Sequence, residues 1–174
     1  MASILKVNTI QDATNSNTAI SVDSSGRVTY PSRPFISFQG SSDANVNIGN
    51  DEMFGATNDG QSAFTTSGSL GQGIRGITYN SATGIFTVPV GGFYHVGFTF
   101  YFNQASDINT RVQMYVDGTL HAMGHAQMPY GNISLNHALV LSANDEIRFQ
   151  NDSGDARTIY EGPAHQFGYI YLIG

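Results

Sequence analysis

The sequence has no cysteine and no tryptophan, a single lysine (Lys6) and few charged residues of either sign. Without cysteine the chain forms neither disulfides nor thiolate metal sites, so its stability must come from packing and from assembly with other chains. The net charge is −6, and only 11% of the residues are charged. This balance argues against nucleic acid or an anionic membrane as a partner.

Long apolar runs are also missing. No segment approaches the ~20 apolar residues that a membrane helix needs, and residues 1–6 lack the basic and apolar regions of a signal peptide. We therefore expect a protein that is made in the cytoplasm and does not insert into a membrane, even if its final location lies outside a cell.

The composition favours β-structure. Hydrophobic residues make up 40% of the 174 residues, and much of the remainder is Ser, Thr, Asn, Gln and Gly, which suits a sheet protein with many turns. Short alternating segments follow one another with turn residues between them and with no helical periodicity. This pattern predicts an all-β antiparallel sandwich.

The chain is organised around residues 73–102, in which residues 93–102 alternate with a period of two. The side expected to face the core holds Tyr94, Val96, Phe98, Phe100 and Phe102. The other side holds Phe93, His95, Gly97, Thr99 and Tyr101. Its mixture of aromatic, small and polar groups suits a surface covered by another chain better than one left in water.

Several motifs stand in a recognisable order. Residues 79–80 read Tyr-Asn, and residues 84–94 read Gly-Ile-Phe-Thr-Val-Pro-Val-Gly-Gly-Phe-Tyr. Together with residues 139–149 and 167–172, they resemble the successive strands of the C1q/TNF-like globular head. The resemblance covers residues 34–174 and implies a ten-strand jelly roll that forms a homotrimer.

The resemblance also implies where the three copies meet. In C1q-like heads the sheet that corresponds to residues 93–102 lies near the three-fold axis, and a tyrosine-lined face is typical of an interface core. We therefore predict a trimer interface formed by His95, Thr99, Tyr101, Tyr169 and Tyr171. The alternative is that these tyrosines cover a sheet exposed to solvent.

Residues 1–33 differ from the rest and are too poor in apolar residues to fold alone, so they must lie on their own head, on sister copies or on a docking surface. Residues 4–11 (Ile-Leu-Lys-Val-Asn-Thr-Ile-Gln) and 18–28 resemble the amino-terminal segments of structural proteins of tailed phages, particularly marine and cyanobacterial ones. We predict a virion-docking or oligomerisation segment. The predicted docking residues are Ile4, Leu5, Val7 and Ile10.

The five histidines raise the question of a metal site. The His121 and His125 pair lies in a predicted strand or loop, where a spacing of four does not converge, and His137 is interpreted as a core imidazole with a hydrogen-bond partner. Three copies of His95 on a three-fold axis would be able to hold an ion, with ordinary packing as the alternative.

The acidic residues gather in turns at 51–52, 145–146 and 152–155. Some members of the resembled family bind calcium, but none of these turns follows the twelve-residue loop pattern with its closing glutamate. Exposed polar turns are therefore favoured over calcium sites, and we expect no cofactor.

Catalytic motifs are missing as well. The sequence has no Gly-x-Ser-x-Gly elbow, no His-Glu-x-x-His, no phosphate-binding glycine loop and no cysteine nucleophile, and its acids sit in turns. We expect a protein that is not an enzyme.

These observations predict a trimeric virion structural protein of a tailed phage, of the fibre or spike type, with residues 34–174 as the projecting head. The loops expected to contact a host-surface glycan or outer-membrane protein are 41–72, 103–110, 121–132 and 150–165. One alternative is a capsid decoration protein that clamps coat subunits. Another is a soluble C1q-like ligand-binding module.

Overall fold

The computed structural model describes residues 7–11, 18–42, 44–67, 72–104, 108–127 and 129–174. The chain divides into two compact units, residues 1–33 and 34–174, which we call the N-terminal unit and the head. What the first unit does stays a prediction.

The N-terminal unit is a three-stranded antiparallel sheet of β1 (Thr9–Gln11), β2 (Thr18–Val22) and β3 (Val28–Thr29), in that order. The turn between β2 and β3 is closed by Asp23, whose carboxylate accepts the backbone N–H groups of Ser25 and Arg27 at 2.9 and 3.0 Å. Of the predicted docking residues, Ile4 and Leu5 lie outside the described residues. Val7 and Ile10 are exposed.

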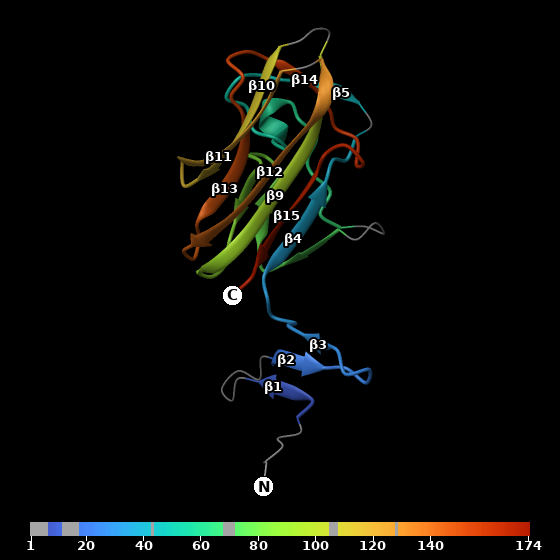
Figure 1. The fold of residues 1–174 in the computed structure, drawn as a ribbon, viewed down its shortest axis with the longest axis vertical. Coiled ribbons are helices and arrows are strands. Elements are labelled where there is room, and N and C mark those ends of the chain that lie inside the picture. Colours follow the sequence, from blue (N-terminus) through green and yellow to red (C-terminus); the bar gives the residue numbers. More distant parts are fainter. Residues whose placement is uncertain (1–6, 12–17, 43, 68–71, 105–107, 128) are drawn as a thin grey trace. The chain divides into compact units, whose positions relative to one another are not determined.

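The head consists of two antiparallel sheets that face each other (Figure 1). The larger sheet contains β5 (Asn45–Ile48), β14 (Arg157–Tyr160), β9 (Gly92–Asn103), β15 (Phe167–Leu172), β4 (Phe35–Gln39) and β6 (Gly73–Arg75), in that order. Its seventh strand, β12 (Tyr130–Leu141), pairs with the edge of β9 that lies opposite to β14 and β15.

The smaller sheet has the strand order β11 (Thr119–Gln127), β10 (Asn109–Val116), β13 (Glu146–Asn151), β8 (Ile85–Thr87) and β7 (Thr78–Asn80). One short 3₁₀ helix, η1 (Thr57–Asp59), lies between β5 and β6. Among the described residues, no helix has the length and hydropathy that a membrane crossing requires. The predicted all-β antiparallel jelly roll is confirmed.

The core lies between the two sheets and is dominated by phenylalanine. The alternation predicted for residues 93–102 is confirmed, because the five core-facing side chains of β9 are all at most 1% exposed. Phe98 of β9 stacks on Phe149 of β13 with 4.5 Å between ring centroids, so aromatic contacts join the two sheets directly.

Local turn chemistry fixes the register of the β10–β11 hairpin. Asp117 and Gly118 form its two-residue turn with φ values of 48° and 76°, both in the left-handed region that glycine and aspartate tolerate best. An Asp-Gly pair between two alternating segments is a strong sequence signal for such a turn.

Three expectations for the head were wrong. The described residues of the head form twelve strands instead of ten, and residues 157–160, interpreted as part of a loop, form β14, which pairs with β5. Residues 121–132, expected to be a loop, lie mostly in β11 and β12. His137 points to the core side of β12 but is only half-buried, since β12 is an edge strand.

The chain enters the head at one end of β9. The N–H of Leu172 donates to the carbonyl of Pro34 at 3.1 Å, and Leu172 pairs with Tyr94 near the start of β9. The 12 residues of β9 then span about 36 Å at ~3.3 Å per residue. The loops at the far end of β9 therefore lie about that distance from the point of entry.

Candidate functional site

The outward side of the larger sheet is lined by aromatic and small uncharged residues, and we call it the aromatic face. Strand pairing aligns its side chains in rows across β12, β9, β15 and β4. On β9, β15 and β4 it consists of Phe35, Ser37, Gln39, Phe93, His95, Gly97, Thr99, Tyr101, Asn103, Phe167, Tyr169 and Tyr171. All five residues predicted for a trimer interface therefore lie on one face, although their role as an interface stays a prediction.

Polar side chains on the aromatic face form hydrogen bonds with one another, from strand to strand within the face. His95 Nδ1 lies 2.9 Å from the hydroxyl of Tyr171, and Thr99 Oγ1 lies 2.8 Å from the Ser134 hydroxyl. The Tyr169 hydroxyl donates to Asn136 Oδ1 at 2.7 Å. Because these groups already have partners, covering the face with another surface leaves few unmade hydrogen bonds.

Gly97 allows Tyr169 to lie flat across the middle of β9. A Cβ at position 97 would come within 2.4 Å of Tyr169 Cζ, so only glycine accommodates the ring in this position. Burial of the ring, followed by the neighbouring Tyr171, raises the pKa of Tyr169. The hydroxyl therefore remains a hydrogen-bond donor at neutral pH.

A second group of rings extends the aromatic face toward the far end of β9. His165 contacts Tyr101 and Tyr160 edge to face, with ring centroids 5.4 and 4.7 Å apart. Tyr160 is also aligned with Tyr101 by the pairing of β14 with β9. Tyr160 and His165 were not predicted as site residues, because residues 150–165 were interpreted as a loop.

Charge distinguishes the two outward faces of the head. Among the residues paired across the aromatic face, Arg75 at the edge is the one formally charged side chain that the structure describes. The outward side of the smaller sheet carries Arg111, Arg148 and Glu146, with the Arg148 guanidinium 5.1 Å from the Tyr115 ring centroid. Depletion of charge is therefore a property of one face and not of the whole head.

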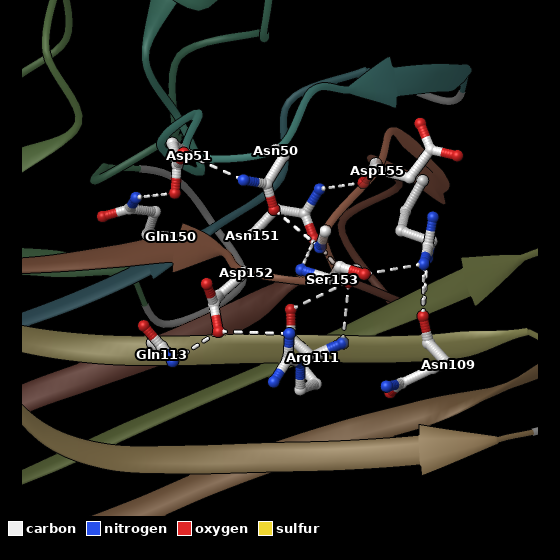
Figure 2. Close-up of polar contacts among 12 residues, drawn as sticks. Asn50, Asp51, Asn109, Arg111, Gln113, Gln150, Asn151, Asp152, Ser153 and Asp155 are labelled. Atoms are coloured by element: carbon white, nitrogen blue, oxygen red, sulfur yellow. Dashed lines mark hydrogen bonds and ion pairs between the residues drawn. The ribbon is translucent and has the colours of Figure 1, made fainter.

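A polar network ties together the loops at the far end of β9, and we call it the distal network (Figure 2). Its centre is the buried Asn151, whose amide nitrogen lies within 3.1 Å of three carbonyl oxygens, those of Ile48, Gly49 and Asp155. Asn151 Oδ1 in turn accepts the Ser153 hydroxyl at 2.6 Å.

Arg157 connects the same loops from the side of β14. The side chain of Arg157 is buried. Its guanidinium donates hydrogen bonds to the carbonyl oxygens of Asn109, Ser153 and Ala156. At the surface, Asp152 accepts a hydrogen bond from Gln113 and lies 3.6 Å from an Arg111 nitrogen. In the acidic turn at 152–155, the Asp152 carboxylate thus already interacts with side chains of the protein.

We predict that Asn151→Ala lowers the free energy of unfolding by about 2–3 kcal/mol, because it leaves buried carbonyl groups without donors. Urea unfolding would measure the loss, and hydrogen exchange should accelerate in residues 48–52 and 153–157. Asn50→Ala is the matched control, since Asn50 is exposed and accepts one hydrogen bond from Gly154 N–H, so it should cost about 1 kcal/mol or less. Equal losses in the two variants would contradict a central role for Asn151.

The described residues bring no three acidic, histidine or cysteine side chains together around a possible metal position, and they enclose no pocket. His121 and His125 are exposed on β11. Since His95 Nδ1 contacts Tyr171, an ion on a three-fold axis would have to be held through Nε2.

No family model and no curated protein sequence matches the chain. Solved structures do match it. Eiger TNF from S. frugiperda aligns with a TM-score of 0.67 and 14% identity over 82% of this chain and 93% of its own. Murine APRIL at pH 5.0 aligns with a TM-score of 0.59 and 12% identity over 81% of this chain and 99% of its own.

These similarities establish the class of fold. The head is a C1q/TNF-like jelly roll, as the motifs in residues 79–94 predicted. The phage resemblance of residues 1–33 stays a prediction.

Proposed function

We propose that the protein is a non-enzymatic structural protein that works as a homotrimer, with three heads packed through the aromatic face. The observation that carries this proposal is the contrast between the two outward faces, because charge depletion and tyrosine enrichment are typical of an interface core. The C1q/TNF-like fold supports the same arrangement.

The exposure of large apolar side chains also supports this interface. In the single chain Tyr171, Phe93 and Phe167 are 40%, 42% and 46% exposed, and Val140, which pairs with Phe93, is 78% exposed. Contiguous apolar surface of this kind is unusual on a monomeric protein and marks a surface that another protein covers.

We further propose that the chain is a virion structural protein of a tailed phage, a fibre- or spike-type appendage that contacts a host-surface glycan or outer-membrane protein. Three features support this role. The first is the resemblance of the sequences of residues 4–11 and 18–28 to structural proteins of tailed phages. The others are the division into two units and the distance between Pro34 and the distal network. In this arrangement the N-terminal unit attaches to the particle, and the hydrogen-bonded loops of the distal network face outward.

Two measurements test the proposal. Light scattering of the purified full chain is expected to give three chain masses, and a monomer would refute the homotrimer. Quantitative mass spectrometry of purified particles is expected to find a low copy number relative to the major coat protein. A simple stoichiometric ratio to coat protein would indicate capsid decoration instead, and absence from the particle would refute any virion role.

A further inference from the structure

The sheet of the N-terminal unit has one apolar face. Ile10 of β1 pairs directly with Ile20 of β2, and Val22 of β2 pairs directly with Val28 of β3. Residues that pair directly lie on the same side of a sheet, and so do residues two apart along a strand. Ile10, Ile20, Val22 and Val28 therefore share one face, which we call the aliphatic face.

The opposite face of the same sheet is polar or small. Ser21 of β2 pairs with Thr9 on one side and with Thr29 on the other, and Ala19 lies on the same side as Ser21. The unit is thus amphipathic, a property that its low content of apolar residues does not indicate. The separation of the two kinds of side chain became visible through the strand register.

Among residues 7–11 and 18–33, which the structure describes in this unit, the aliphatic face has no covering layer. Ile10 is 49% exposed and Val28 is 53% exposed, while Ile20 and Val22 are half-buried. A unit of residues 1–33 with such short strands and no cysteine is too small to bury enough apolar surface to be stable alone. Another surface must therefore cover it.

We propose that the aliphatic faces of the three copies in the homotrimer cover one another. This inference rests on the proposed homotrimer. Four β-branched aliphatic side chains offer neither charge nor hydrogen bonds, so the face suits a second copy of itself better than a charged or hydrogen-bonding partner. Identical patches that meet around a symmetry axis are the usual way in which homo-oligomers close.

The attachment of the unit to the head supports this choice of partner. The chain enters the head at Pro34, directly before Phe35 of β4, and Pro34 bonds to Leu172 of β15. Both strands contribute to the aromatic face. When three heads pack through that face, their entry points belong to the interface sheet of each copy. The three aliphatic faces are then tethered at a high effective concentration.

The turn chemistry keeps the charges of Asp23 and Arg27 off the aliphatic face. Asp23 and Arg27 pair with each other at 2.6 Å within the β2–β3 turn, so both charged groups are held in the turn and not on the strands. Covering the aliphatic face with two further copies therefore does not bury the charge of Asp23 or Arg27 without its partner.

Single cysteines in the full-length chain test this inference, because the natural sequence has no cysteine and each variant carries one thiol. Ile20→Cys and Val22→Cys place the thiol on the aliphatic face, and Ala19→Cys places it on the opposite face as the matched control. Each variant is sized by light scattering, oxidised mildly at several protein concentrations and analysed on a non-reducing gel.

We expect at least one aliphatic-face variant to form disulfide-linked dimers at every concentration, with about two thirds of the chains linked, because each trimer closes one pair. Ala19→Cys should form several-fold fewer dimers, and its yield should depend on concentration. If the chain is a trimer but neither aliphatic-face variant exceeds Ala19→Cys, this inference is wrong while the homotrimer stands. A monomer in light scattering would overturn both.

Discussion

Thr99→Asp is expected to split the homotrimer into monomers. Thr99 lies in the middle of the aromatic face, paired with Ser134 on one side and with Phe167 on the other. A carboxylate at this position would be buried in the trimer without a cationic partner, and an uncompensated buried charge costs several kcal/mol. The trimer would bury three of them, so its dissociation constant should rise by many orders of magnitude.

The monomer should tolerate the same substitution. Thr99 is half-exposed in the single chain, and aspartate in a strand costs about 1 kcal/mol or less through its lower β-propensity. Light scattering and circular dichroism should therefore show a folded protein of one chain mass. Thr99→Asn is the matched control, because it has nearly the same shape without the charge and should stay trimeric. A Thr99→Asp protein that remains a trimer would exclude this face from the interface.

Phe98→Ala is expected to lower the free energy of unfolding by about 4 kcal/mol, the cost of truncating a fully buried phenylalanine. Phe98 touches Phe149 across the gap between the sheets and meets the Phe54 ring edge to face at 5.2 Å. Its removal leaves a cavity at the junction of the two layers. The free energy of unfolding of a folded domain is only about 5–15 kcal/mol in total. The loss should therefore lower the melting temperature by roughly 10 °C.

Leu120→Ala is the control for this prediction, because Leu120 is 44% exposed on the outward side of β11. It should cost less than about 1 kcal/mol. Urea unfolding of both variants must be followed at one protein concentration, since assembly makes stability concentration-dependent. Equal unfolding midpoints would show that the aromatic cluster does not hold the sheets together.

Alternation and turn chemistry made part of the fold predictable. In β9 every second residue is large and apolar, so both the strand and its buried side followed from the pattern. The Asp117-Gly118 turn likewise followed from local backbone preferences. These two elements are governed by residues close together in the sequence, and there prediction from one sequence is strongest.

The continuation of β11 beyond Leu120 escaped prediction because its inward residues are small. Ala122, Gly124 and Ala126 alternate with exposed residues, but none of them is a large apolar side chain. The reason lies across the sandwich, since a Cβ on Gly124 would come within 2.4 Å of Ile133 Cγ2 of β12. Close approach of the two layers selects for small residues at this edge, and a single sequence does not show that approach.

β14 and the distal network were not predicted from the sequence, for a different reason. Arg157 is buried through hydrogen bonds to backbone carbonyl groups, so a charged residue occupies a position where a strand pattern predicts an apolar one. Asn151 is buried through contacts with Ile48 and Gly49, about a hundred residues earlier in the chain. Polar groups buried in this way depend on distant backbone partners and therefore resemble loop residues in the sequence.

The position of β9 also has a mechanical consequence. β9 is hydrogen-bonded to β12 along its whole length and to β15 and β14 on its other edge, and it runs from the entry of the chain toward the distal network. A pull between Pro34 and the outer loops acts along these strands. It loads their hydrogen bonds in shear, so that many must break together, whereas a sideways pull would peel them apart one after another.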